Sequence, residues 1–251
     1  LCPYEGKDYH IMCGIVGFTG MRAGREAILK AMTDAIAHRG PDGEGFYVDE
    51  QVALGHRRLS IIDLEGGSQP MFNEDGSVVI VFNGEIYNFM ELRAQLETAG
   101  HTFATHSDTE VLIHGYEEWG EGMLAKLRGM FAFAIWNEAE QTLFCARDHF
   151  GIKPFYYYLT DEGELLFGSE IKSFLAHPGF KKELNQSQLE LYLSYQYSPG
   201  EDTFFKGVKK LLPAHSLLWK AGQVDVKRYW EPRFEPEEGK SLSDWESRVE
   251  E

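Results

Sequence analysis

The 251-residue chain has little cysteine and no long apolar run. Cys2, Cys13 and Cys145 lie far apart and none is in CxxC spacing. This argues against a disulfide framework and a structural zinc site, and it favours a reducing compartment, the cytoplasm. The longest apolar runs, 78–82 and 130–136, are far shorter than the roughly 18 residues of a membrane span. Residues 1–12 are polar and lack the apolar segment of a signal peptide. The sequence therefore predicts no membrane partner.

Basic residues are also scarce, because 24 lysines and arginines face 40 acidic residues for a net charge of −16. Phosphate contacts require a basic face, so nucleic acid is excluded as a partner. Residues 231–251 hold eight acids and three bases, which predicts a solvated acidic linker. The nine histidines show no HExxH or similar spacing. We therefore predict no catalytic metal.

Strands and helices alternate in blocks along the chain. β-Branched and aromatic residues predict strands at 15–19, 46–48, 52–62, 78–82, 130–136, 142–147, 155–159, 165–168, 216–220 and 224–229. Helical periodicity predicts helices at 24–37, 89–98, 109–118, 171–176 and 186–195, and residues 38–45 are predicted to form a loop. Without strict strand–helix–strand alternation, this order favours an α+β fold with mostly antiparallel sheets.

The last residues carry a helix start. Ser243 and Glu246 fit a capping box, and Trp245 and Val249 follow with i, i+4 spacing. We expect a domain to begin there, the rest of which the chain does not contain. The alternative is a frayed surface helix.

Cys13 stands before a short strand, in the segment MCGIVG. A cysteine in this setting is most often a buried structural residue. The preceding Met12 favours another interpretation, because removal of an initiator methionine would make Cys13 the N-terminal residue. Its α-amine, with a pKa of about 8, would then be a base beside the thiol. This is the arrangement of an N-terminal nucleophile.

Asn83 and Gly84 follow a strand in the segment FNGEIYN. Asn-Gly is typical of a tight turn. In a functional interpretation, the Asn83 side-chain amide and the unshielded Gly84 N–H would form an oxyanion hole.

Two charged segments complete a possible site. The pair Arg57-Arg58 ends a strand, where arginines are usually solvated but could hold a carboxylate with a bidentate fork. Asp108, in HSDTE, could face an ammonium group, although Ser107 or Asp108 is also a good helix N-cap. Together with Cys13 and the Asn83-Gly84 pair, these residues describe a site for an α-amino acid with a scissile side-chain amide.

The motifs MCGIVGFTG, HRGPDGEG, GHRRLSIIDLEGGSQP, FNGEIYN, SDTEV, GMFAFAIW and RDHFGIKPFYY resemble the glutamine amidotransferase domain of glutamine-hydrolysing asparagine synthetases, as do SEIKSFL and the late Tyr229-Trp230. The likeness runs from Met12 to about Trp230. It implies an N-terminal-nucleophile fold, a four-layer αββα sandwich of two antiparallel sheets between helical layers. It also implies three parts of the chain: an extension (1–12), the amidotransferase domain (13–230), and an acidic linker that leads into a truncated synthetase domain (231–251).

The resemblance assigns roles residue by residue. Cys13 is expected to be the nucleophile, and Asn83 and Gly84 the oxyanion hole. Arg58 is expected to bind the glutamine α-carboxylate and Asp108 the α-amine. The glutamine pocket is expected to be completed, partly through backbone contacts, by Leu59, Ile61, Ile62 and Glu85.

The implied activity is hydrolysis of L-glutamine to glutamate and ammonia, for amidation of aspartate by the C-terminal synthetase domain. ATP and Mg²⁺ are expected in the whole enzyme, but no cofactor in this chain, which lacks the Ser-Gly-Gly-x-Asp-Ser pyrophosphate loop. A homodimer is a further expectation. Two alternatives stay open: a synthetase-like enzyme with another acceptor, and a non-catalytic domain of the same fold.

Residues 1–12 depart from the family pattern. While they remain attached, Cys13 has an amide nitrogen in place of an amine, and the base is missing. They are either a propeptide or the result of a wrongly assigned start. We favour a start at Met12.

Overall fold

The computed structural model describes residues 13–59 and 67–234, together with Gly239, Ser241, Trp245, Ser247 and Arg248. Two six-stranded sheets form its centre. The first sheet, sheet A, has the strand order β10 (Lys209–Lys210), β8 (Tyr156–Leu159), β9 (Leu165–Gly168), β1 (Gly14–Thr19), β3 (Val52–Arg58), β2 (Gly43–Val48). The second, sheet B, has the order β12 (Gln223–Arg228), β11 (His215–Lys220), β7 (Thr142–Arg147), β6 (Gly129–Asn137), β5 (Val78–Ile86), β4 (Met71–Phe72). All pairings between these strands are antiparallel.

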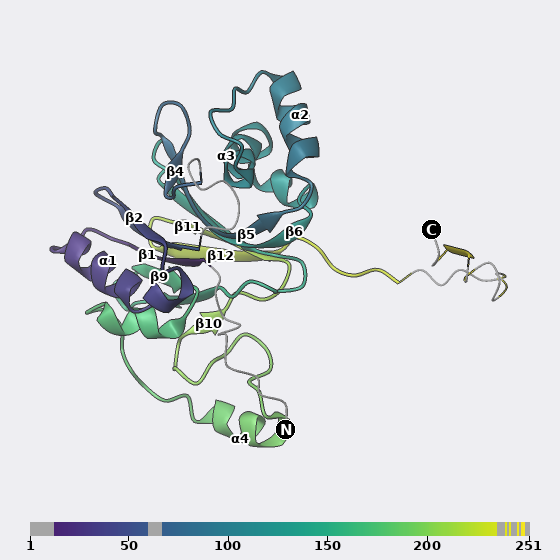
Figure 1. Ribbon diagram of the computed structural model, residues 1–251. Coiled ribbons are helices and arrows are strands. Elements are labelled where there is room, and N and C mark those ends of the chain that lie inside the picture. The colour runs from purple at the N-terminus through teal and green to yellow at the C-terminus, as the bar shows by residue number, and fades with distance from the viewer. Residues whose placement is uncertain are drawn as a thin grey trace, which may run out of the picture.

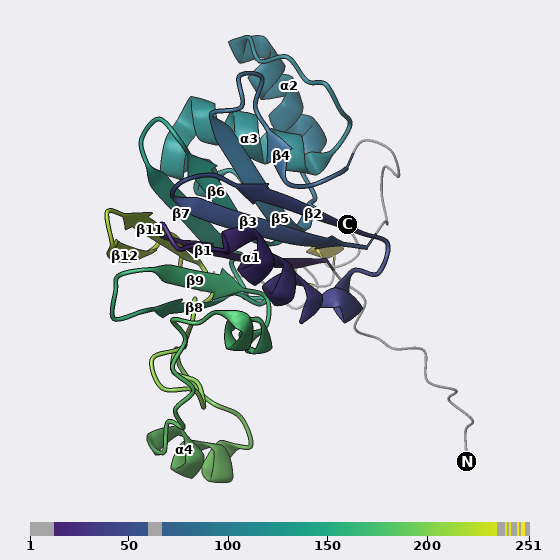
Figure 2. The ribbon, with the colours of Figure 1, turned by 90° about the vertical axis from the view of Figure 1, so that its left-hand side faces the viewer.

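Helices cover the outer face of each sheet (Figures 1 and 2). Sheet A carries α1 (Arg25–Asp34), with the 3₁₀ helices η1 (Ala37–Arg39) and η3 (Ile171–Ala176). Sheet B carries α2 (Phe89–Ala99) and α3 (Asp108–Trp119), followed by the 3₁₀ helix η2 (Gly120–Ala125). The helix α4 (Ser187–Tyr195) projects away from the sandwich in both views.

Three apolar clusters correspond to the three interfaces between these layers. One joins sheet A to α1 and η3, one lies between the sheets, and one joins sheet B to α2 and α3. Burial of each cluster drives the stacking of its two layers. The predicted αββα sandwich of antiparallel sheets is therefore confirmed.

The inner faces of the two sheets determine where the site lies. Ile15 of β1 and Val81 of β5 belong to the cluster between the sheets. Because side chains alternate along a strand, Asn83, two positions after Val81 in β5, points to the same inner side. Cys13 directly precedes β1, at the same end of that strand as Ile15.

Most predicted elements are present, but several predicted boundaries were wrong, among them the end of the first helix, predicted at 37 and found at Asp34. β5 continues through Asn83 and Gly84 to Ile86, because β6 pairs with it along its whole length. The turn interpretation of Asn83-Gly84 is therefore wrong. β2 begins at Gly43, and residues 37–39 are helical, so the loop predicted at 38–45 is only partly a loop. β3 ends at Arg58, short of the predicted residue 62, and residues 60–66 lie outside the described part.

The end of the described chain holds part of the predicted final helix. Trp245, Ser247 and Arg248 are helical, whereas Ser243, Glu246 and Val249 lie outside the described residues. In the part of the chain that the structure describes, no helix is long and apolar enough to cross a membrane.

Candidate active site

A pocket opens at the end of the sandwich where β1 begins and β3 ends. Its walls bring together residues from separate segments of the chain: Cys13, His56, Arg58, Leu59, Gly67, Gln69, Phe82, Gly84, Glu85, Ser107, Asp108 and Thr109. Six of the nine residues predicted from the sequence are among them. Asn83 lies between two lining residues of β5. Ile61 and Ile62 fall outside the described residues, so their expected place in the pocket stays a prediction.

The Cys13 thiol sits against the backbone of Leu59. Its Sγ donates to the Leu59 carbonyl oxygen at 3.6 Å, and the Leu59 N–H lies 3.4 Å from the same sulfur. Arg39 Nε donates to the Cys13 carbonyl oxygen at 3.1 Å and fixes the backbone. Burial raises the pKa of the Cys13 thiol, and the Leu59 N–H and the positive charge of Lys153 oppose this rise. The thiol therefore requires a base to become a nucleophile at neutral pH.

Asn83 and Gly84 lie opposite Ala132 and Phe131 in the β5–β6 ladder. Asn83 is buried, and its side-chain Nδ2 has no hydrogen-bond partner among the described residues. Buried polar groups are nearly always paired, so this amide is a donor available to a ligand. Gly84 is required by packing, because a Cβ there would lie 2.2 Å from the Met130 carbonyl oxygen.

The two adjacent arginines have different surroundings. Arg57 donates through Nε to the Thr33 carbonyl oxygen at 3.1 Å, and its Nη2 forms ion pairs with Asp34 and Glu44. Arg58, on the other face of β3, lines the pocket. The structure thus leaves Arg57 at the outer layer and places Arg58 in the wall of the pocket.

Asp108 begins α3 in the wall of the pocket. Ser107 is the N-cap, since its Oγ accepts from the Thr109 N–H. The Asp108 Oδ2 accepts from the Ile86 N–H at 2.9 Å, which ties the carboxylate to the end of β5. Burial raises the pKa of Asp108, and the neighbouring negative charge of Glu85 adds to the rise. An ammonium group bound there would relieve both effects.

Lys153 is a buried cation that the sequence interpretation missed. It follows β7 in a turn built by Asp148, whose carboxylate accepts from the Lys153 N–H at 2.9 Å. The whole residue is 4% exposed. Burial lowers the pKa of Lys153, whereas the charges of Glu85 and of the Cys13 thiolate favour the ammonium form. In the sequence, the sign of a buried cation was a lysine among the apolar residues that follow Gly151.

The turn that carries Lys153 also accounts for the Arg147-Asp148 pair. Asp148 accepts from several backbone N–H groups, and Arg147 donates to the carbonyl oxygens of Gly151, Lys153 and Leu211. These bonds give the pair a structural role in the turn.

His56 and Gln69 were also missed. The buried His56 donates through Nε2 to the Phe82 carbonyl oxygen at 3.1 Å, and burial lowers its pKa to about 4. It is therefore neutral at pH 7 and too weak a base to hold the thiol proton. Gln69 accepts from the Phe82 N–H at 2.6 Å and donates to Thr109 Oγ1 at 3.4 Å, which links β5 to α3. Only the fold brings these residues to the pocket.

The pocket thus combines a thiol, a guanidinium group from β3 and a carboxylate from α3. Between two of its lining residues in β5 lies the amide of Asn83, whose Nδ2 has no hydrogen-bond partner among the described residues. This set matches a ligand with a carboxylate, an ammonium group and a carbonyl carbon open to attack.

Comparison with known proteins agrees with this chemistry. The family model described as "Glutamine amidotransferase domain" matches residues 12–230. Asparagine synthetase [glutamine-hydrolyzing] 1 of Bacillus subtilis is 44% identical over 231 residues, which is 90% of this chain and 36% of that protein. A protein of Gibberella zeae named Amidase chry2 is 39% identical over 218 residues, 85% of this chain and 32% of its own. The chain thus spans about a third of the length of these relatives.

Among solved structures, the glutamine phosphoribosylpyrophosphate amidotransferase of B. subtilis aligns with a TM-score of 0.66 at 21% identity, over 88% of this chain and 50% of that one. This likeness supports the fold assignment alone.

Proposed function

The chain belongs to the glutamine amidotransferase domain family, and we propose that it hydrolyses L-glutamine to glutamate and ammonia with Cys13 as nucleophile. One observation carries the proposal: the Cys13 thiol, the Arg58 guanidinium and the Asp108 carboxylate line one pocket. These groups match the scissile amide, the α-carboxylate and the α-ammonium of glutamine.

The reaction begins with proton transfer from the Cys13 thiol to its own α-amine. The thiolate attacks the side-chain carbonyl carbon of glutamine, a C–S bond forms, and the oxygen takes the negative charge. Asn83 Nδ2 and the Gly84 N–H would hold this oxyanion, and one such donor is worth about 2.7–4 kcal/mol. The C–N bond then breaks, and the amine returns its proton to the departing ammonia. Water, deprotonated by the same amine, hydrolyses the γ-glutamyl thioester to glutamate and restores the thiol.

The positions of the other residues around the pocket support the roles proposed for them. Arg58 would bind the α-carboxylate, and Asp108, whose pKa is raised by burial, would bind the α-ammonium. Leu59 and Glu85 would border the side chain of glutamine, as would Ile61 and Ile62. Lys153 would stabilise the thiolate electrostatically.

The amine is the base that this proposal requires. His56, the histidine that lines the pocket, has a pKa of about 4. A chain that begins at Leu1 has an amide nitrogen at Cys13, without a basic lone pair. We therefore propose that the active form begins at Cys13, after loss of residues 1–12 or initiation at Met12.

In the whole protein, the ammonia would reach a synthetase domain that amidates aspartate with ATP and Mg²⁺. The relatives of which this chain covers about a third support that proposal. The relative named Amidase chry2 keeps another acceptor open. The exposed apolar side chains of α4 and its C-terminal flank fit a surface for the synthetase domain, among them Leu193, Tyr195 and Tyr197. The free thiols of Cys13 and Cys145 fit a reducing cytoplasm. Homodimer formation stays a prediction.

The test compares glutamate release by two forms of the chain, each with its N-terminus verified by mass. A form translated from Met12 and trimmed to Cys13 should hydrolyse glutamine, and the 251-residue form should not. The matched control is Cys13→Ala in the trimmed form, which should abolish release. Full activity from a chain that retains Leu1 would overturn the role of the amine. A trimmed form that neither releases glutamate nor is labelled by a glutamine-analogue electrophile would support the non-catalytic alternative.

A further inference from the structure

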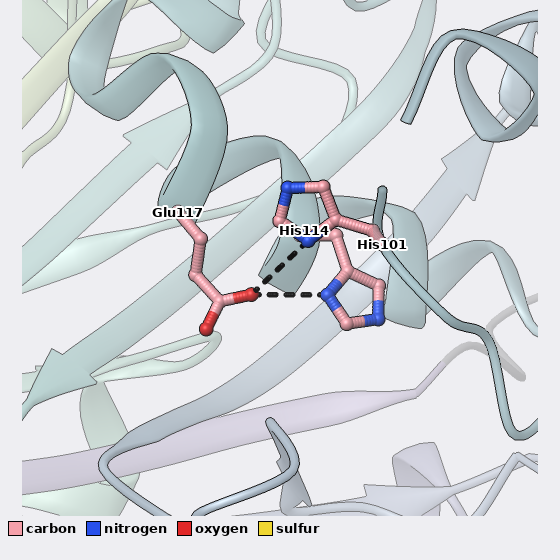
Figure 3. A group of neighbouring side chains, drawn as sticks. All are labelled: His101, His114 and Glu117. Atoms are coloured by element: carbon pink, nitrogen blue, oxygen red, sulfur yellow. Dashed lines mark hydrogen bonds and ion pairs between the residues drawn. The ribbon is translucent and has the colours of Figure 1, made fainter. Parts of the chain in front are cut away.

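Two histidines and a glutamate meet on the outer layer of sheet B, away from the pocket. His101 lies just after the C-cap of α2, whereas His114 and Glu117 lie one turn apart on α3 (Figure 3). Glu117 Oε2 lies 3.0 Å from His114 Nδ1 and 3.8 Å from His101 Nδ1. One atom of each side chain can be chosen so that all three lie within 4.8 Å of one another. This spacing is close to that of ligands around one metal ion.

Carboxylates face the outer nitrogens of both rings. Glu118 Oε2 lies 3.2 Å from His101 Nε2, and Glu110 Oε1 lies 3.7 Å from His114 Nε2. A carboxylate only accepts, so Glu118 favours the His101 tautomer with the proton on Nε2. A metal bound at His114 Nδ1 would place the His114 proton on Nε2, which faces Glu110. In that tautomer each Nδ1 presents a lone pair toward the centre of the cluster. Metal-bound histidines in proteins are commonly oriented in this way by an outer carboxylate.

The third side chain is oriented as well. Asn73 Nδ2 donates to Glu117 Oε1 at 2.8 Å, which leaves Oε2 directed at the two rings. The glutamate is exposed, so an ion can enter from solvent, whereas His114 is buried and its ring packs edge-on against Phe103. Neighbouring residues therefore fix the orientation of the ligand side chains, and the cluster is open to solvent on the side of Glu117.

A neutral His114 satisfies this cluster poorly in either tautomer. If His114 Nδ1 donates to Glu117, its Nε2 becomes a buried lone pair that faces the Glu110 carboxylate. That nitrogen has no hydrogen-bond partner among the described residues. If the proton sits on Nε2, a ring lone pair meets a carboxylate oxygen at 3.0 Å. A cation at the centre removes both conflicts.

We propose that His101 Nδ1, His114 Nδ1 and Glu117 Oε2 bind one Zn²⁺ ion, with water as a fourth ligand. Two imidazoles and one carboxylate form a donor set typical of Zn²⁺, whereas Ca²⁺ and Mg²⁺ prefer oxygen ligands alone. Ligands about 2.1 Å from a tetrahedral metal are roughly 3.4 Å apart. This value lies between the 3.0 Å and 3.8 Å that separate Glu117 Oε2 from the Nδ1 atoms of His114 and His101. The ion would also offset the charge of the three glutamates around the rings.

Such an ion would fasten the connection between α2 and α3. This connection ends at Ser107 and Asp108, and Glu110 already accepts from the N–H groups of Ala104 and Thr105 within it. A metal bridge from His101 to α3 would hold the other end of the same segment. The proposal does not depend on glutamine hydrolysis, because its ligands lie outside the pocket.

The test is Zn²⁺ binding by the metal-free 251-residue chain, in a Cys2→Ser, Cys13→Ser background that removes thiol ligands other than the buried Cys145. Calorimetry should find one site, Zn²⁺ should raise the melting temperature, and Co²⁺ should give the visible absorption of a four-coordinate site. His101→Asn and Glu117→Gln should each weaken binding by more than about 100-fold, and Glu118→Gln by about 10- to 100-fold. The matched control, His215→Asn, should leave binding unchanged.

A melting curve of each metal-free variant first establishes that the variant is folded. His101→Asn and Glu117→Gln change partly exposed residues, and both should lose the same site, so each checks the result of the other. Absence of Zn²⁺ binding by the background chain would overturn the proposal and leave a proton-bonded cluster. Binding that survives both His101→Asn and Glu117→Gln would overturn it equally, because the ion would then lie elsewhere.

Discussion

Arg57 and Arg58 are adjacent at the end of β3, yet their side chains serve opposite faces of sheet A. The Arg57 guanidinium lies 2.8 Å from Glu44 Oε2 and also pairs with Asp34 at the end of α1. Arg58 lines the pocket that also contains Cys13. Because side chains alternate along a strand, the two charges lie on opposite faces: Arg57 is paired at the end of α1, whereas Arg58 lies in the wall of the pocket.

This relationship gives the first prediction, a comparison of Arg58→Ala with Arg57→Ala. Arg58→Ala should raise the glutamine KM of the trimmed form by about 30-fold or more, because loss of a charge partner costs roughly 2–5 kcal/mol. Arg57→Ala should lower the melting temperature while the KM stays within a few-fold of normal. Steady-state glutamate release and thermal melting distinguish them. Equal effects of both variants on KM would contradict the assignment of Arg58.

Asp108→Ala is the second prediction, and it removes the partner of the α-ammonium group. Its KM for glutamine should also rise by about 30-fold or more. Glutaramate, which lacks the α-amine, should be hydrolysed equally poorly by the variant and the parent. If the variant discriminates between the two compounds as strongly as the parent does, Asp108 does not bind the amine.

Asn83→Ala is the third prediction. Loss of one oxyanion donor should reduce kcat by about 10²- to 10³-fold, with little change in KM, because the bond strengthens only as the charge develops. Asn88→Ala provides the control, since that amide bonds to the backbone of Lys126 and Arg128 at the surface. A normal kcat for folded Asn83→Ala would remove the residue from the oxyanion hole.

The sequence predicted the sandwich because its local signals agree with the tertiary structure. Gly100 and Gly120 are the C-caps of α2 and α3, close to the predicted helix ends at 98 and 118. The strands predicted at 130–136 and 142–147 pair as β6 and β7, and those predicted at 155–159 and 165–168 pair as β8 and β9. Asn83-Gly84 shows where local signals fail. The pair is typical of a turn, but its pairing with β6 extends the strand through it. Cross-strand hydrogen bonds override a preference of the two residues alone.

The remaining parts of the site depend on contacts that no local pattern contains. The two-residue strands β4 and β10 are too short for periodicity to reveal. His56 and Lys153 lie about a hundred positions apart, and only the packing of the sheets brings both near Cys13. His101 and His114 are separated by a loop and a helical turn. Their spacing in the sequence therefore gives no sign of the cluster, which only the packing of the segment after α2 against α3 forms.

Lys153 provides the fourth prediction. In the trimmed form, Lys153→Met should raise the apparent pKa of Cys13 and slow its alkylation by iodoacetamide at pH 7 about tenfold, because a nearby opposite charge stabilises a thiolate. Lys153→Arg should restore much of the rate. The exposed Lys172→Met is the control and should react like the parent. The pH profile of alkylation separates this effect from a general loss of structure, and an unchanged profile would rule out the electrostatic role.

His56 gives the last prediction, which concerns stability at mildly acidic pH. Burial lowers its folded-state pKa from 6.5 to about 4, so the folded protein disfavours the protonated ring. Between these two values the unfolded chain binds the extra proton, and the free energy of unfolding falls as the pH falls. The stability that the neutral His56 ring contributes is fully present above pH 6.5, and it is lost as the pH falls to about 4. One pKa unit corresponds to about 1.4 kcal/mol, so this residue accounts for roughly 2–3 kcal/mol between pH 7 and 4.5.

Urea unfolding at pH 7 and at pH 4.5 measures this loss. His56→Gln keeps an N–H for the Phe82 carbonyl oxygen and cannot be protonated, so it should lose roughly 2–3 kcal/mol less than the parent over this range. His177, whose pKa burial also lowers to about 4, acts in the same direction and leaves a residual slope in the variant. His215→Gln, at the surface end of β11, should keep the parent's full pH dependence. If His56→Gln does so too, the acid sensitivity of the fold arises from groups other than the histidine in the pocket.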